Sequence, residues 1–238
     1  METELAVCLA LDHIPVSRAV WLTSQLGKRV YAVKIHSLFD EGGAELVWQL
    51  KQVGARRVWV DAKLHDSPDT VRERVAALAR AGADIVTVHA DGGVAMMRAA
   101  REGAAVRADS PVTVWAVTVL TSLTVMDIPS RPIRELALER ALLAEQAELT
   151  GFTCPAHEVQ VLTNTPQLRK MLAVVPGTRS LGVPQHDQKR SVTPTQAIKW
   201  GAHMLVVGRE VTKADDPLAA FNAFANEVEA ARKNRCAA

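Results

Sequence analysis

The sequence has few cysteines, almost no net charge and no long hydrophobic run. Cys8, Cys154 and Cys236 are far apart, which argues against a disulfide framework and against a zinc site. Lysine and arginine number 28 against 26 aspartate and glutamate, so the chain lacks the basic excess typical of nucleic-acid-binding proteins. Any cationic site must therefore be local.

No apolar run approaches the length that spans a membrane, and no charged-then-apolar segment typical of a secretion signal opens the sequence. The seven histidines show no metal-ligand spacing. Hydrophobic residues make up 48% of the chain and charged residues 23%, which predicts a sizeable core. We expect a soluble cytoplasmic protein that binds neither nucleic acid nor membrane and holds no metal.

Short apolar runs alternate with segments of helical spacing along the whole chain. The runs predict strands at residues 5–11, 30–35, from 58, 85–89, 112–119, 151–154, 172–175 and 204–207. The helical segments cover residues 16–26, about 41–53, 69–81, 92–100, 133–149, 156–163, 194–200 and 217–231.

Eight strand–helix units in 238 residues predict one (β/α)8 barrel that spans residues 1–238 as a single domain. No linker rich in proline, glycine or serine divides the chain. The alternative is a doubly wound open sheet, which usually has fewer strands at this length. It would also carry a glycine-rich dinucleotide turn after its first strand, and that turn is missing here.

Charged residues stand where the first four predicted strands end: Asp12, Lys34, Asp61 with Lys63, and His89. In such barrels the reactive groups lie at these carboxyl ends. Residues i and i+2 of a strand share a face, so Asp61 and Lys63 should project side by side. Each could be an ordinary ion pair at the barrel rim, but their shared position favours a fixed catalytic array in which acids keep the lysines charged.

Arginine and glycine recur after the seventh and eighth strands, where barrels often bind phosphate. Gly177 and Gly208 permit close backbone approach, while Arg179 and Arg209 can fork onto phosphate oxygens. The alternative is an ordinary surface loop with solvated cations. The pattern alone therefore predicts a barrel enzyme acting on a small phosphorylated anion, with a lysine as its acid or base.

The residues Asp61-Ala62-Lys63-Leu64-His65-Asp66 closely resemble the Asp-x-Lys-x-x-Asp signature of orotidine 5′-phosphate decarboxylases. That signature recurs in related sugar-phosphate barrels, but further segments also fall in family order over about residues 5–229. They are Ala10-Leu11-Asp12, Lys34, Val86-Thr87-Val88-His89-Ala90, Val117 to Ser122, Pro176 to Arg179, Asp187-Gln188-Lys189-Arg190 and Val207-Gly208-Arg209.

The resemblance implies a role for each matching residue. Asp12 would bind the ribose hydroxyls, and Thr121 would read the amide edge of the pyrimidine. The catalytic array would consist of Lys34, Asp61, Lys63 and Asp66. The 5′-phosphate would be held by Arg179, Gln188, Gly208 and Arg209, with the loop between Gly177 and Gln188 closing over it.

The resemblance also implies a homodimer without metal or organic cofactor, in which Asp66 and Thr70 reach the neighbouring subunit's site. The expected reaction converts orotidine 5′-monophosphate to uridine 5′-monophosphate, the last step of uridylate biosynthesis. Ser67 stands where many relatives carry isoleucine, and Asp69 where asparagine is common; both leave the charged array intact. The alternatives are a metal-dependent sugar-phosphate decarboxylase or synthase, and a catalytically silent nucleotide-binding barrel.

Overall fold

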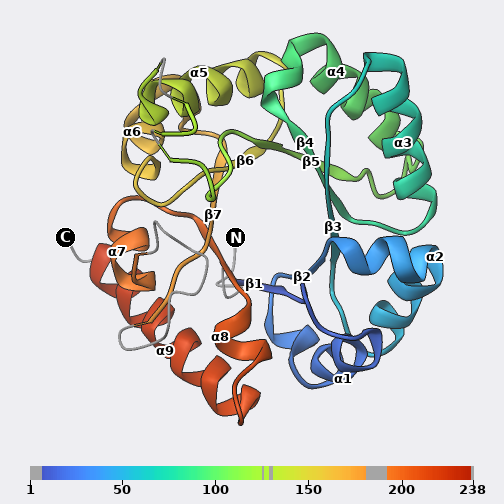
Figure 1. Cartoon of the computed structure of the whole chain (residues 1–238), viewed down its shortest axis with the longest axis vertical. Helices are drawn as coiled ribbons and strands as arrows, with labels where there is room; N and C mark the ends of the chain where they lie inside the picture. The colour runs from blue at the N-terminus through green and yellow to red at the C-terminus, as the bar shows by residue number, and fades with distance from the viewer. Residues whose placement is uncertain (1–6, 125, 129–130, 181–191, 237–238) are drawn as a thin grey trace.

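The computed structural model describes residues 7–124, 126–128, 131–180 and 192–236. Within these residues eight parallel strands close into one barrel in the order β1 to β8, and helices surround it (Figure 1). The predicted (β/α)8 barrel is confirmed. The strands are β1 (Val7–Ala10), β2 (Ala32–Ile35), β3 (Val58–Leu64), β4 (Ile85–His89), β5 (Thr113–Val117), β6 (Gly151–Thr153), β7 (Leu172–Pro176) and β8 (Met204–Val207).

The α-helices follow the strands in sequence. They are α1 (Val16–Leu26), α2 (Ser37–Gln52), α3 (Pro68–Arg80), α4 (Gly93–Ala104), α5 (Ile133–Gln146), α6 (Val159–Asn164), α7 (Pro194–Lys199), α8 (Arg209–Thr212) and α9 (Pro217–Cys236). Helix α2 begins earlier than its periodicity predicted, with a kink at Gly43, whose φ is +53°. The four-residue helix α8 was not predicted, because one turn carries no periodic signal.

The barrel closes where β1 pairs with β8, with Val7 opposite Leu205 and Leu9 opposite Val207. This pairing removes the unpaired edges that an open sheet would expose. All carboxyl ends of the strands therefore lie at one end of the barrel, so the charges that follow strands far apart in sequence are brought together.

Two layers of apolar side chains hold the barrel. One layer lies between the strands and the helices. The other fills the barrel interior with Cys8, Ala10, Ala32, Trp59, Ile85, Trp115, Val174, Met204 and Val206. Trp59 and Trp115 meet edge to face with ring centroids 5.0 Å apart, a favoured aromatic arrangement. The interior is therefore packed below the open end rather than hollow.

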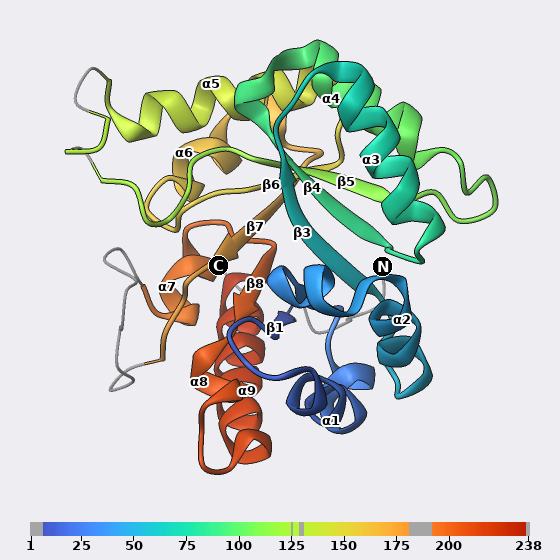
Figure 2. The same ribbon diagram turned by 45° about the vertical axis from the view of Figure 1, so that its right-hand side comes forward.

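Helices α3 and α4 lie side by side on the outside of the barrel (Figure 2). They approach closely because Gly103 lacks a side chain: a Cβ there would lie 2.2 Å from the carbonyl oxygen of Arg72. Any larger residue at this position would push the two helices apart. The close packing fixes α3, which directly follows the charged end of β3.

Candidate active site

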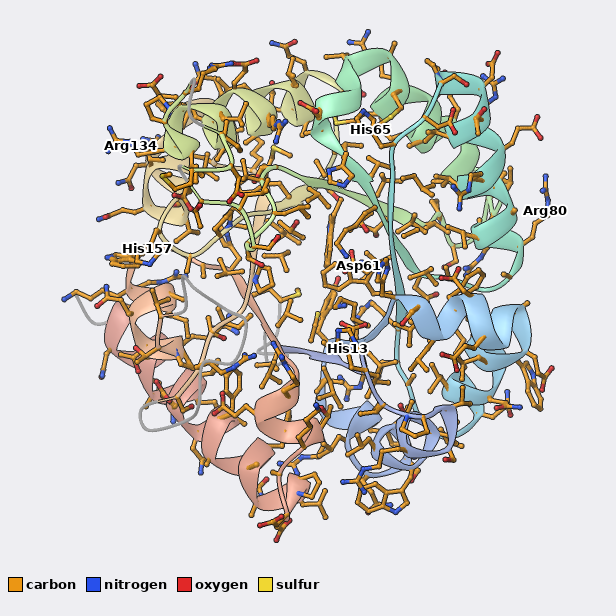
Figure 3. All side chains as sticks on the ribbon, viewed as in Figure 1. His13, Asp61, His65, Arg80, Arg134 and His157 are labelled. Atoms are coloured by element: carbon orange, nitrogen blue, oxygen red, sulfur yellow. The ribbon has the colours of Figure 1, made fainter. Side chains whose placement is uncertain are left out.

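A cavity of about 230 Å³ opens at the carboxyl ends of the strands. Its polar lining comes from residues in or just after β1, β2, β3, β5, β6, β7 and β8, at the end of the barrel where the sequence predicted the reactive groups. Figure 3 shows Asp61 near the centre of the barrel, with His13 on the side of β1. The predicted residues that line the cavity are Asp12, Lys34, Asp61, Lys63, Thr121, Arg179, Gly208 and Arg209.

Acids and lysines alternate across the cavity floor. Nζ of Lys34 lies 2.5 Å from Oδ2 of Asp12 and 3.2 Å from Oδ2 of Asp61. Nζ of Lys63 lies 2.5 Å from the same Asp61 oxygen. Three members of the predicted array, Lys34, Asp61 and Lys63, thus form one continuous chain of opposite charges with Asp12, while Asp66 does not join it.

This alternation of opposite charges keeps the two most buried members, Lys34 and Asp61, ionised. Burial alone would lower the pKa of Lys34, but the charges of Asp61 and Asp12 outweigh it and leave that pKa above its ordinary value. Burial alone would raise the pKa of Asp61, but the charges of Lys34 and Lys63 hold it well below its usual range. At neutral pH Lys34 is therefore an ammonium and Asp61 a carboxylate.

Strand β3 departs from regular geometry where its charged residues lie. Lys63 has φ +46°, a left-handed conformation uncommon for a residue with a side chain. The pairing with β4 also shifts between Val60 and Leu64. The prediction that Asp61 and Lys63 are neighbours is correct, but simple alternation along a regular strand is not the whole reason: a bulge re-aims Lys63.

Two arginines lie at the β7 and β8 side of the cavity. Arg179 is buried, and one of its guanidinium nitrogens donates to the carbonyl of Thr178 at 2.7 Å. Arg179 and Arg209 line the same cavity, and burial and then the charge of Arg209 lower the pKa of Arg179. Gly177, at φ +79°, provides a backbone turn that favours glycine. Two like charges at one end of a cavity favour an anionic ligand.

Three described residues that the sequence placed at the site, Asp66, Thr70 and His89, do not line this cavity. Asp66 is exposed, and its carboxylate accepts a hydrogen bond from the backbone N–H of Ser67 at 2.6 Å. The hydroxyl of Thr70 lies 2.9 Å from that of Ser67. Gln188 lies outside the described residues. His89 is half-buried, with its ring centroid 5.7 Å from that of His65.

The sequence predictions missed several residues of the cavity wall. His13 follows Asp12 at the end of β1, and Cys154 follows β6, so the rule that reactive groups stand at strand ends could have found both. Trp59 was predicted as a core residue, and it is both buried in the barrel interior and part of the cavity floor. Thr87 does not line the cavity but contacts Asp61 and Lys63; no role was predicted for it, because it is a small residue inside an apolar strand.

Among the residues that the structure describes, no group of three or more histidine, cysteine, aspartate or glutamate side chains is placed to hold a metal ion. In the same part of the chain, no helix combines the length and apolarity needed to cross a membrane.

The fold and the cavity define a barrel enzyme with an acid–lysine array and a cationic end for an anionic group. The chain belongs to the orotidine 5′-phosphate decarboxylase / HUMPS family, whose sequence model matches residues 6–224. It is 39% identical over 231 residues to the orotidine 5′-phosphate decarboxylase of Cutibacterium acnes, covering 94% of this chain and 97% of that relative. The corresponding protein of Dichelobacter nodosus is 39% identical over 225 residues, covering 92% and 96%.

The fold is shared with a solved relative. The crystal structure of orotidine 5′-phosphate decarboxylase from Lactobacillus acidophilus superimposes with a TM-score of 0.79 at 33% identity, covering 93% of this chain and 98% of that one. The family that the motifs indicated is confirmed.

Proposed function

We propose that this protein decarboxylates orotidine 5′-monophosphate to uridine 5′-monophosphate in pyrimidine biosynthesis. The family and the named relatives support this reaction. The observation that carries it for this chain is the position of the Lys34 ammonium, 2.5 Å from Asp12 and 3.2 Å from Asp61. A metal-dependent relative would need an acid at that position to hold its cation. Here the ammonium itself lies between the two carboxylates.

The cavity suggests how the nucleotide is bound. The 5′-phosphate is placed against Arg179 and Arg209, near the backbone of Gly177 and Gly208, because two arginines can each donate a pair of hydrogen bonds to phosphate oxygens. Gln188 is proposed to join them when the loop closes. The free energy of phosphate binding, far from the reacting carbon, can then drive closure of the loop and exclude water from the cavity.

The rest of the substrate extends toward the array. We assign the ribose hydroxyls to Asp12 and Lys34, which are already paired in the structure. Thr121, which lines the opposite wall after β5, is assigned to the amide edge of the pyrimidine. This orientation places C6 of the base beside Lys63 and its carboxylate beside Asp61.

The proposed chemistry uses the charges of Lys63 and Asp61. The bond between C6 and the carboxylate breaks, carbon dioxide leaves and the electron pair stays on C6. The Lys63 ammonium stabilises that developing charge and then transfers its proton to C6. Repulsion between Asp61 and the substrate carboxylate raises the energy of the bound substrate by on the order of 4 kcal/mol at ~4 Å with an effective dielectric near 20.

We further propose a homodimer whose active sites are shared. Asp66 follows β3 and is exposed, Thr70 lies partly exposed in the first turn of α3, and neither lines the cavity of its own subunit. In this arrangement they complete the partner subunit's site, with Asp66 extending the array. We also place the enzyme in the cytoplasm, with the nucleotide as its small-molecule partner and neither nucleic acid nor membrane. The buried free thiols of Cys8 and Cys154 are compatible with a reducing compartment.

The test is release of carbon dioxide and formation of uridine 5′-monophosphate, measured with and without a strong chelator. We expect equal turnover in both, because the charges at the reacting carbon belong to side chains. Loss of turnover on chelation, with recovery on adding magnesium, would assign the protein to the metal-dependent branch. Nucleotide binding without turnover would identify a silent barrel.

A further inference from the structure

Thr87 lies opposite the irregular segment of β3. Val60 pairs with Val86 and Leu64 with Val88, so residues 61–63 of β3 face the single residue 87 of β4. Such a bulge leaves backbone groups without ladder partners, and buried polar groups of this kind must be satisfied in another way.

The hydroxyl of Thr87 takes the place of the missing ladder bond. It accepts a hydrogen bond from the backbone N–H of Lys63 at 3.1 Å and donates one to Oδ1 of Asp61 at 2.7 Å. Thr87 is fully buried, so no solvent competes for either bond. One side chain from β4 therefore contacts both halves of the acid–lysine pair on β3.

The two bonds orient the Asp61 carboxylate. Because the Asp61 carboxylate can only accept a hydrogen bond, the hydroxyl proton of Thr87 points to Asp61, and the hydroxyl oxygen accepts from the Lys63 N–H. Oδ1 of Asp61 then faces Thr87, and Oδ2 is left to receive Lys34 and Lys63. On the other flank, Nδ1 of His36, just after β2, lies 2.7 Å from the carbonyl oxygen of Asp61. The bulge is held from both neighbouring strands.

We propose that Thr87 is a positioning residue for the decarboxylation, an inference that rests on the proposed function. Its hydroxyl holds Lys63 in its left-handed conformation and fixes the rotation of the Asp61 carboxylate. The ammonium is thereby aimed at the reacting carbon before substrate arrives. Thr87 itself does not line the cavity and acts only through these two residues.

Thr87→Val removes the hydroxyl and nearly preserves the volume. We expect kcat to fall roughly 10- to 100-fold, the usual effect of losing a residue that orients a catalytic group. KM should stay within about threefold, since the phosphate and ribose contacts are remote from the bulge. Thr87→Ser keeps the hydroxyl and should retain kcat within about threefold. In an Asp61→Asn background, Thr87→Val should add little further loss, because the two act together.

A second readout does not depend on activity. Hydrogen exchange at the Lys63 amide should accelerate at least about tenfold in Thr87→Val and stay near the wild-type rate in Thr87→Ser. Thr23→Val is the matched control: Thr23 is also buried, but its hydroxyl donates to the carbonyl of Ala19 within α1, far from the bulge. It should alter neither kcat nor exchange at Lys63.

A Thr87→Val enzyme with wild-type kcat and slow Lys63 exchange would overturn the assignment. So would a Thr87→Ser enzyme as impaired as Thr87→Val, which would indicate packing rather than the hydroxyl. If Thr87→Val fails to fold by circular dichroism, Thr87→Ala against Thr87→Ser is judged by the same two criteria. Failure of the proposed function is separate: the wild type would then release no carbon dioxide, while exchange at Lys63 would still decide the role of Thr87.

Discussion

Nζ of Lys63 lies 2.5 Å from Oδ2 of Asp61, and both side chains come from strand β3. The acid that pairs with the ammonium is thus part of the same strand as the proposed proton donor. The left-handed φ of Lys63 turns its side chain toward the carboxylate. A group held this way is available for proton transfer without reorganisation.

Lys63→Ala should lower kcat at least about 10²-fold, because it removes both the proton donor and the charge that stabilises the carbanion. Single-turnover release of carbon dioxide measures this step directly. Lys51→Ala is the control: Lys51 also forms a lysine–aspartate pair, 2.9 Å from Asp84, at the opposite end of the barrel. It should keep kcat within about threefold. Wild-type kcat in Lys63→Ala would exclude Lys63 as the donor.

If its guanidinium binds the phosphate, Arg209→Ala should reduce kcat/KM for the nucleotide roughly 10²-fold, which corresponds to a loss of about 3 kcal/mol of transition-state stabilisation. For orotidine, which lacks the phosphate, the loss should be below about threefold. Arg134→Ala, on the outer surface of α5 in Figure 3, serves as the control and should change neither value. Equal losses for both substrates would mean that Arg209 supports the fold instead.

The shared site makes a quantitative prediction. Lys63→Ala and Asp66→Ala homodimers should each be nearly inactive. Co-refolding equal amounts makes half the dimers mixed, and each mixed dimer has one site with both residues intact. The mixture should therefore recover about a quarter of wild-type activity, as two-fold symmetry requires. Absence of recovery despite confirmed subunit exchange would place Asp66 in its own subunit's site.

Stability should fall on acidification partly through His203. Its Nδ1 accepts the backbone N–H of Ala173 at 3.0 Å, so the ring must stay unprotonated there. Burial, then the charges of Arg235 and Arg232, lower the pKa of His203. The unfolded chain, with a histidine pKa of about 6.5, therefore binds the proton more readily, and stability declines as pH falls below that value toward the folded pKa.

His203→Asn offers a carbonyl acceptor to Ala173 but cannot titrate. Urea unfolding between about pH 7.5 and 5 should show a smaller loss of stability in this variant than in the wild type. His157→Asn, at an exposed position on the outer surface in Figure 3, should keep the wild-type slope. If the free energy of unfolding of His203→Asn depends on pH as steeply as that of the wild type, protonation of His203 does not contribute to the loss of stability.

Local signals in the sequence were sufficient to predict the fold and to place most of the candidate site residues at the open end of the barrel. Apolar runs and helical spacing mark each element over a few residues, and helix α1 has the predicted limits. Asp12, Lys34 and Arg209 were predicted as site residues because each stands at the carboxyl end of a strand. In a barrel all these ends lie at one face, so residues at strand ends are expected to lie close together. The motif around Lys63 indicated the family because its residues lie within one short segment of the sequence.

Other features were decided only by tertiary structure. Asp12, Lys34 and Asp61 form one charged chain because β1, β2 and β3 pair in a particular register, which no single segment specifies. The bulge in β3 becomes evident only against β4, where Thr87 satisfies the Lys63 N–H. Sequence determined which groups stand at the barrel's open end, since that depends on local periodicity. Their distances, charges and orientation depend on contacts between strands distant in the chain, so only the folded barrel decided them.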